Sequence, residues 1–333
     1  PATMPISPAE LGAMFFHTLT NSIGLAGNSL LLYLVLMKSP KNIRTYSVLM
    51  FNFALTDFCG CLFALFVQQR IIPIGWSLAY ISSGPCKYFG PLVCYVSYSA
   101  MLHCYAHSLY SLLLSFLYRY YVLKSRNLTV KKLIIILIAI YPLSFFQFIT
   151  FCFASDDPEQ ILPILHKGFP EYQTIGHMVS GTINIFEWKA LFTILHMTLP
   201  VSPIYAVIIW IRSRIIKTLQ GHKMSESTKT MHRQLLNALT FQAILPGLFL
   251  IAVITYALGQ TGIYNHPILE FSTFLVIGVM PVISPLGTLY YIRPYQQWIR
   301  KNVLRQEIAA SSIQPSNVYS TPNGPSDASF YQA

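Results

Sequence analysis

Polar side chains repeat along one long apolar stretch, and they are the residues of this sequence best placed to do chemistry. The repeat has a four-residue spacing, which puts its members on one face of a helix: Ser99, His103, His107 and Ser111. A polar face inside an apolar helix is expected to point into the interior of a bundle. We therefore predict that this face, with Tyr98 above it, lines a cavity for a small ligand.

Other kinds of chemistry find less support in the sequence. His103 and His107 have the spacing of two metal ligands, but no acidic residue lies near them, so we predict no metal site and no cofactor. An intramembrane enzyme would need a recognisable set of residues, such as paired Asp residues in helices or a His-Glu-x-x-His motif. Neither is present, and we predict that the chain is not an enzyme.

Seven apolar stretches must position these side chains. Hydrophobic residues make up 54% of the 333 residues and charged residues only 10%, whereas soluble domains carry about 25% charged residues. A membrane-spanning helix needs about 20 apolar residues. The stretches that meet this requirement run over residues 12–37, 45–67, 91–118, 133–153, 190–211, 234–258 and 268–292. The sequence therefore predicts an all-α membrane protein, a bundle of seven transmembrane helices over residues 12–292.

Two acidic residues and several prolines interrupt the apolar stretches. Asp57 lies within the second, and Glu270 lies about one turn into the seventh. Glu270 could place a charge at the cavity mouth or could be a carboxylate at the membrane interface, and the sequence leaves both open. Prolines such as Pro246 and Pro285 bend membrane helices, and bent helices favour a cavity among them.

The basic residues predict how the bundle crosses the membrane. Of the 22 Lys and Arg residues, 18 follow the first, third, fifth or seventh stretch. Because Lys and Arg next to a span are retained in the cytoplasm, we predict an extracellular amino terminus, residues 1–11. Residues 293–308 are then a cytoplasmic juxtamembrane segment and 309–333 a disordered cytoplasmic tail. The net charge of +11 is thus a topology signal, and we expect no nucleic-acid partner. The outer loop 155–189 is interpreted as a lid over the bundle.

Cysteines near the outer face could form a disulfide, because that side is oxidising. Either Cys86 or Cys94 could reach Cys152, and of the two we favour Cys86 with Cys152. Free thiols are the alternative. Cys59, Cys61 and Cys104 are expected to be free.

Several residues resemble landmarks of rhodopsin-like G-protein-coupled receptors. Asn28 and Asp57 resemble an Asn and an Asp that face each other across a polar core in that class. The alternative is that Asp57 has only a structural role, as a hydrogen-bonded side chain in the packing. Arg119, between two tyrosines, stands where that class has a cytoplasmic latch, but the acid before the Arg is missing. With Pro246 and Pro285, these residues are expected to serve activation or structure in a divergent receptor.

The order of four short motifs is similar to that of the nematode chemosensory serpentine receptors of class delta. The motifs are Lys38 to Tyr46, Gly84 to Cys86, Tyr118 to Tyr120 and Arg293 to Tyr295, and the similarity covers about Leu25 to Trp298. This resemblance implies an olfactory receptor in the plasma membrane of sensory cilia. It also implies a small odorant-like ligand and a heterotrimeric G protein as partners.

A solute transporter is the alternative function. Seven-helix carriers with an external amino terminus are built from parallel three-helix repeats. The first three predicted helices here do not match the last three, so we favour the receptor.

Overall fold

A computed structural model of the chain describes residues 8–40, 43–124, 128–172, 174, 176–221 and 226–305. The chain divides into two compact units, Pro1–Gln296 and Gln297–Ala333. The first unit holds all the features described below. The predicted tail, residues 309–333, and the first seven residues of the predicted extracellular terminus lie outside the described residues.

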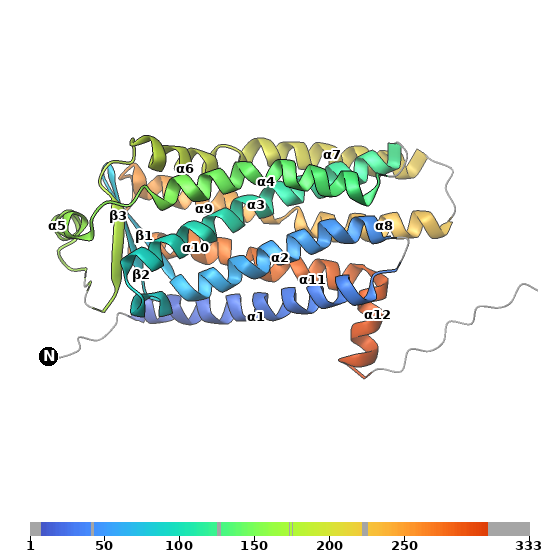
Figure 1. Ribbon diagram of the computed structural model, residues 1–333, viewed down its shortest axis with the longest axis horizontal. Helices are drawn as coiled ribbons and strands as arrows, with labels where there is room; N and C mark the ends of the chain where they lie inside the picture. The colour runs from blue at the N-terminus through green and yellow to red at the C-terminus, as the bar shows by residue number, and fades with distance from the viewer. Residues whose placement is uncertain are drawn as a thin grey trace, which may run out of the picture. The chain divides into compact units, whose positions relative to one another are not determined.

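The described part of the chain has seven helical spans long and apolar enough to cross a membrane, which confirms the predicted fold (Figure 1). The first four spans are single helices, and each of the last three is a pair of helices. They are α1 (Pro8–Lys38), α2 (Arg44–Val67), α3 (Pro91–Lys124), α4 (Val130–Cys152), α6 (Trp188–Thr198) with α7 (Val201–Gly221), α8 (Glu226–Gln242) with α9 (Leu245–Gln260), and α10 (Pro267–Gly278) with α11 (Met280–Tyr291).

Prolines account for the breaks in the last three spans. Pro200 lies between α6 and α7, and Pro246 and Pro281 lie in the first turns of α9 and α11. A proline has no backbone N–H and clashes with the preceding turn, so a helix tends to restart at it. Pro142 and Pro285, in contrast, lie inside the continuous helices α4 and α11.

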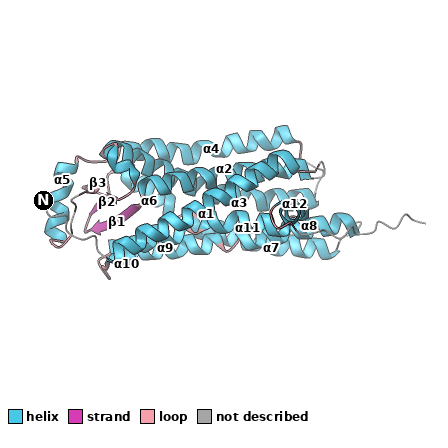
Figure 2. Cartoon of the chain, turned by 90° about the horizontal axis from the view of Figure 1, so that it is seen from below, coloured by secondary structure: helices cyan, strands magenta, loops and turns pink. Residues whose placement is uncertain are grey.

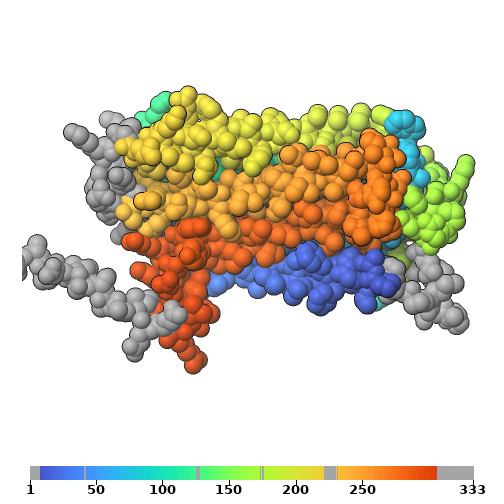
Figure 3. Space-filling model, turned by 180° about the vertical axis from the view of Figure 1, so that it is seen from behind, coloured from blue at the N-terminus to red at the C-terminus, as the bar shows by residue number. Residues whose placement is uncertain are grey.

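The spans close into one bundle with α3 at its centre. In its most apolar window α3 is 72% buried, whereas α4 is only 22% buried. The last span packs beside the first, as the orange and blue surfaces in Figure 3 show. Side chains of α3 are therefore enclosed by protein on most sides, and α4 presents most of its surface outward.

A three-stranded sheet at one end of the bundle was not predicted. It is antiparallel in the order β1 (Gln69–Ile74), β2 (Ser77–Ser82) and β3 (Met178–Thr182), and Figure 2 shows it beside α5 (Pro158–Gly168). Gly75 in the turn between β1 and β2 has φ +57°, a conformation that favours glycine. Tyr80 of β2 pairs with Ser180 of β3, a hundred residues later, so no local pattern predicts the sheet.

Apolar residues of the sheet and α5 form a small core of their own. Its buried members are Ile72, Ala79, Ile81, Ile161, Leu165 and Val179. Asp157 caps α5 by accepting a hydrogen bond from the backbone N–H of Glu159. We call β1, β2, β3 and α5 the cap, and the end of the bundle that carries it the sheet end. The opposite end, where α3 finishes at Lys124, is the basic end. The predicted lid thus folds as part of a larger cap.

The disulfide differs from the one that we favoured. Cys86, in the short 3-10 helix η2 (Pro85–Tyr88), bonds to Cys94 in the first turn of α3, with the two Cα atoms 5.1 Å apart. Cys152 is free, as are Cys59, Cys61 and Cys104. The prediction of a Cys86–Cys152 bond is therefore wrong. Both η2 and the first turn of α3 flank Gly90, whose φ of +98° reverses the chain and brings the two cysteines together.

Candidate functional site

The polar face of α3 meets the neighbouring helices α2 and α4. His107 is buried, with its Nε2 3.4 Å from the amide oxygen of Asn52 on α2 and its Nδ1 3.3 Å from the Ser144 hydroxyl on α4. Asn52 also donates to the Ser111 hydroxyl at 2.8 Å. These side chains join three helices through hydrogen bonds, which is a structural arrangement.

Ser99 and His103, the other two residues of the same face, also contact protein and not an open space. Ser99 donates to the backbone carbonyl of Tyr95, one turn earlier. The ring of His103 packs against Tyr141 and Phe145 of α4, with centroid distances of 5.2 and 6.3 Å. The four-residue spacing correctly put these residues on one face of α3. The prediction that this face lines a cavity is wrong, because the face packs on α2 and α4.

A cavity lies directly beneath the cap, and Tyr98 is the one predicted ligand residue that lines it. Its volume is about 80 Å³. Strands β1 and β2 roof it, and α3, α4, α6, α9 and α10 form its walls. The lining is uncharged: Ile71, Leu78, Tyr80, Tyr98, Leu102, Phe151, Thr193, Ile194, Met197, Thr198, Phe249, Ala252, Val253, Tyr256, Thr273, Phe274 and Ile277.

Aromatic rings from four elements meet at Tyr98 in the wall of this cavity. Its ring centroid lies 5.1 Å from that of Tyr80 on β2, 5.7 Å from Phe151 on α4 and 5.6 Å from Phe274 on α10. The contacts with Phe151 and Phe274 are edge-to-face. Such rings provide a rigid apolar surface that suits an aliphatic or aromatic guest.

Hydroxyl groups supply the polarity of the cavity. Thr273 already shares a hydrogen bond of 3.2 Å with Thr255. The buried hydroxyl of Tyr256, in contrast, has no hydrogen-bond partner among the described residues. A buried polar group without a partner is costly, so a guest with one hydrogen-bonding atom would be stabilised at Tyr256.

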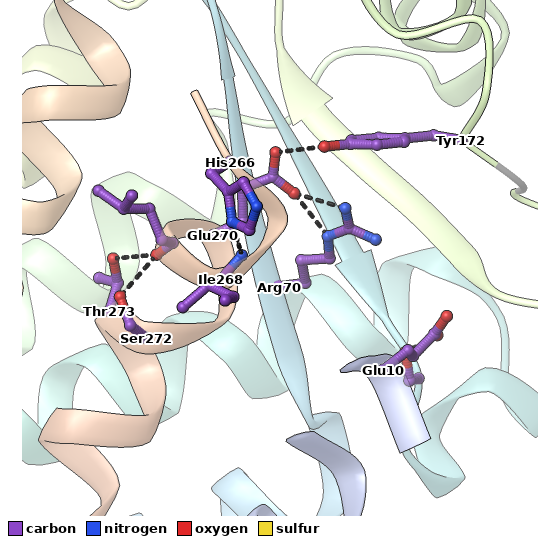
Figure 4. Close-up of polar contacts among 10 residues, drawn as sticks. Glu10, Arg70, Tyr172, His266, Ile268, Glu270, Ser272 and Thr273 are labelled. Carbon is purple, nitrogen blue, oxygen red and sulfur yellow. Dashed lines mark hydrogen bonds and ion pairs between the residues drawn. The ribbon is translucent and has the colours of Figure 1, made fainter. Parts of the chain in front are cut away.

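Glu270 lies three residues before Thr273 of the cavity lining, and Figure 4 shows its bonds to Arg70 and Tyr172. One carboxylate oxygen accepts from Nε of Arg70 on β1 at 2.7 Å and also contacts Nη2, and the other accepts from the Tyr172 hydroxyl at 2.8 Å. The side chains of Arg70 and Glu270 are only 11% and 4% exposed. Glu270 is therefore half of a buried ion pair. The positive charge of Arg70 neutralises its carboxylate, so the pair adds no net charge beside the cavity.

Aromatic rings complete the surroundings of this ion pair. The guanidinium carbon of Arg70 lies 4.4 Å from the ring centroid of Tyr172 and 4.7 Å from that of Phe271. Burial and the negative charge of Glu270 raise the pKa of Tyr172, so its phenol stays protonated and donates. Arg70 is not among the site residues predicted from the sequence. Its position could have pointed to it, because Arg70 is one of the four Lys and Arg residues that do not follow the first, third, fifth or seventh apolar stretch.

A second polar contact joins the cap to α1. His177, just before β3, has its Nε2 3.2 Å from Glu10 and its Nδ1 3.1 Å from the hydroxyl of Ser83. Burial lowers the pKa of His177, and the negative charge of Glu10 opposes that shift. The cap is thus attached to the first and the last span through ionisable groups.

Comparisons with known proteins agree with this architecture. The family model described as "Serpentine type 7TM GPCR chemoreceptor Srd" matches residues 13–301. The chain belongs to this family. Serpentine receptor class delta-19 of Caenorhabditis elegans is 42% identical over 280 residues, which cover 82% of this chain and 83% of that receptor. Serpentine receptor class delta-18 of the same organism is 39% identical over 315 residues, covering 89% and 94%.

Membership of the class delta family confirms the predicted resemblance. It makes the chain a multi-pass membrane protein of a chemoreceptor family, and the relatives named above are receptors by name. The transporter alternative gains no support from these comparisons.

The polar residues of the receptor's middle section hydrogen-bond to separate partners. Asn28 on α1 donates to the backbone carbonyl of Pro281 on α11 at 2.9 Å. Asp57 on α2 accepts from the Ser108 hydroxyl of α3 at 2.8 Å. Both side chains are buried, and each links two spans. In the described residues, Asn28 and Asp57 do not hydrogen-bond to each other, although both belong to the bundle's polar interior.

Arg119 is buried at the basic end of the receptor and faces a tyrosine. Its guanidinium carbon lies 3.7 Å from the ring centroid of Tyr46 on α2, and the Tyr46 ring in turn stacks on Tyr118 with centroids 6.0 Å apart. Nε and Nη2 of Arg119 have no hydrogen-bond partner among the described residues. A cation–π contact therefore holds this Arg where an acidic residue is missing from the sequence.

Proposed function

We propose that this receptor binds a small, neutral, mostly apolar molecule in the cavity beneath the cap and signals to a heterotrimeric G protein. The observation that carries the proposal is the cavity lining, which has aromatic rings, no charged side chain and a buried hydroxyl, that of Tyr256, without a partner among the described residues. An odorant with an apolar skeleton and a single carbonyl or hydroxyl group would match this lining. Family membership supports a chemosensory role, which we place in the plasma membrane of sensory cilia.

Binding would require the cavity to expand. A cavity of about 150 Å³ holds a molecule of the size of benzene, and this one has about 80 Å³. Thr198 is the last residue of α6 and Phe249 lies in the second turn of α9, so both lining residues adjoin a helix break. A ligand that pushes on these walls would favour a second packing of the lower helices α7 and α8.

The second packing would expose the basic end to the G protein. Arg119 would leave the Tyr46 ring and become available to the partner, in place of the broken ion pair expected of rhodopsin-like receptors. The predicted orientation, with the amino terminus outside, supports this assignment because it puts the sheet end toward the ligand and the basic end in the cytoplasm.

The test is G-protein activation in cells that express the receptor with a tag on its amino terminus. A panel of small neutral ketones and alcohols is compared with their charged carboxylate or amine analogues, and we expect responses only to neutral compounds. Tyr256→Phe should weaken the response to a responding ketone about fivefold to tenfold, the value of one hydrogen bond. Tyr290→Phe, an exposed tyrosine outside the cavity, is the matched control.

Two results would contradict the proposal. A response to charged compounds would exclude the uncharged cavity as the binding site. An amino-terminal tag that antibodies reach only after permeabilisation would reverse the assignment of the two ends.

A further inference from the structure

A groove at the basic end lies on the outside of the bundle, between the last turns of α3 and the first turns of α4. Its volume is about 680 Å³, far more than that of the cavity beneath the cap. Leu117 of α3 and Ile135 of α4 line it and are 42% and 64% exposed. Exposed apolar side chains on a membrane span face lipid, so the groove opens to the bilayer.

The side chains of the groove change from apolar to basic toward the end of the bundle. Lys124 ends α3, and Leu117 lies seven residues earlier, or about 10 Å deeper in the membrane. On α4, which runs the opposite way, Lys132 lies in the first turn and Ile135 in the next. Tyr120 and Tyr121 lie between the two levels, where tyrosines mark the membrane interface. A phospholipid has the same gradient, from acyl chain to headgroup.

The charge of the groove has one sign. Both lysines are exposed and line the groove, and no Asp or Glu is among its lining residues. Among the described residues neither ammonium group forms an ion pair, and the Lys124 ammonium lies 5.5 Å from the ring centroid of Tyr120. Two cations with no carboxylate between them favour an anionic headgroup over a zwitterionic one.

We propose that this groove is a binding site for a phospholipid with an anionic headgroup. The acyl chain would lie against Leu117 and Ile135, and the phosphate and headgroup would lie between Lys124 and Lys132. Tyr118 also lines the groove and stacks on the ring of Tyr46, so the occupant would contact the part of α3 that carries Arg119. This site is separate from the proposed ligand cavity and does not depend on it.

The test is native mass spectrometry of the purified full-length receptor, titrated with phosphatidylserine and with phosphatidylcholine of the same acyl chains. We expect the wild type to bind phosphatidylserine about tenfold more tightly. The double variant Lys124→Gln and Lys132→Gln should lose this preference and keep its binding of phosphatidylcholine. Equal binding of both lipids by the wild type, or a preference that survives in the double variant, would overturn the proposal.

A matched pair of lysines controls for the loss of charge. Lys38 of α1 and Lys217 of α7 are also exposed and lie outside the groove. Lys38→Gln with Lys217→Gln should leave the preference unchanged, whereas an equal loss would assign it to net charge and reject the site. Lys124→Arg with Lys132→Arg should retain the preference, which separates charge from misfolding. Glycerophosphoserine, the soluble headgroup, should not compete at millimolar concentration, and competition would mean a simple anion site.

Discussion

The two ends of this receptor treat charge in opposite ways. At the sheet end the charged side chains of Arg70 and Glu270 are buried and neutralise each other, and the cavity below them is uncharged. At the basic end Arg119 is buried against the ring of Tyr46, and the exposed Lys124 and Lys132 have no carboxylate partner among the described residues. The buried ion pair therefore ties β1 to α10 at the sheet end, whereas the exposed lysines at the basic end are the groups that an anionic partner would contact.

Breaking the ion pair at the sheet end is expected to have the largest effect. Glu270→Ala leaves the Arg70 guanidinium buried without a carboxylate, which costs about 3–5 kcal/mol in comparable cases. The measurement is the thermal unfolding midpoint of the purified receptor, which should fall by several degrees. Glu187→Ala is the control, because Glu187 pairs with Lys189 at 3.3 Å but both are much more exposed, so the cost should stay below about 1 kcal/mol. Equal losses in the two variants would refute the internal neutralisation of the cap.

The disulfide provides a second test of the stability of the sheet end. Cys86→Ser removes a bond that closes a loop of eight residues, which should cost about 2–3 kcal/mol. Cys152→Ser, which alters a free thiol, should cost far less. The unfolding midpoint of both variants without reductant checks this. Equal losses from the two variants would instead favour the Cys86–Cys152 pairing that we predicted from the sequence.

Removing the ring beneath Arg119 tests the basic end. Tyr46→Leu should raise signalling in the absence of ligand, because a cation–π contact worth about 1–2 kcal/mol no longer holds the guanidinium in the resting packing. Basal G-protein activity should rise several-fold, while Tyr46→Phe, which keeps a ring, should stay near the wild type. Arg119→Ala should reach the cell surface and fail to signal, and normal signalling by this variant would remove its assigned role.

The smallest expected effect is a pH dependence at the sheet end. Burial lowers the pKa of His177 below its ordinary 6.5, so the unfolded chain binds more protons here than the folded one. Stability from this group is therefore complete above pH 6.5 and declines as the pH falls below it. The wild type should lose more stability between pH 7.5 and pH 5.5 than His177→Gln does, as followed by the unfolding midpoint. The reverse order would mean that pairing of protonated His177 with Glu10 outweighs burial.

Much of the fold could be predicted from local composition. Nearly charge-free stretches of about 20 residues revealed all seven spans, because each span must by itself present apolar side chains to the hydrocarbon core. Pro246 likewise marks a helix break as expected, because a proline disrupts its own helix, whereas Pro285, also expected to bend a helix, lies inside the continuous helix α11. The order of short motifs was enough to identify the family.

The site could be predicted only in part. The spacing of Ser99, His103, His107 and Ser111 correctly put them on one face of α3, since a helix has a fixed period. It could not say that this face packs on α2 and α4, because the rotation of a helix depends on its neighbours. Tyr98 was found, whereas Tyr256 and the strand residues of the cavity were not.

The sequence by itself determined the number of spans, the excess of basic residues on one side, and the membership of the family. The tertiary structure alone decided the sheet beneath which the cavity lies, the partner of Cys86, the pairing of Arg70 with Glu270 and the ring that holds Arg119. The physical reason is the distance along the sequence over which each interaction acts. Apolarity and helical period act over a few residues, whereas Arg70 and Glu270 lie 200 residues apart and meet only after the bundle has closed.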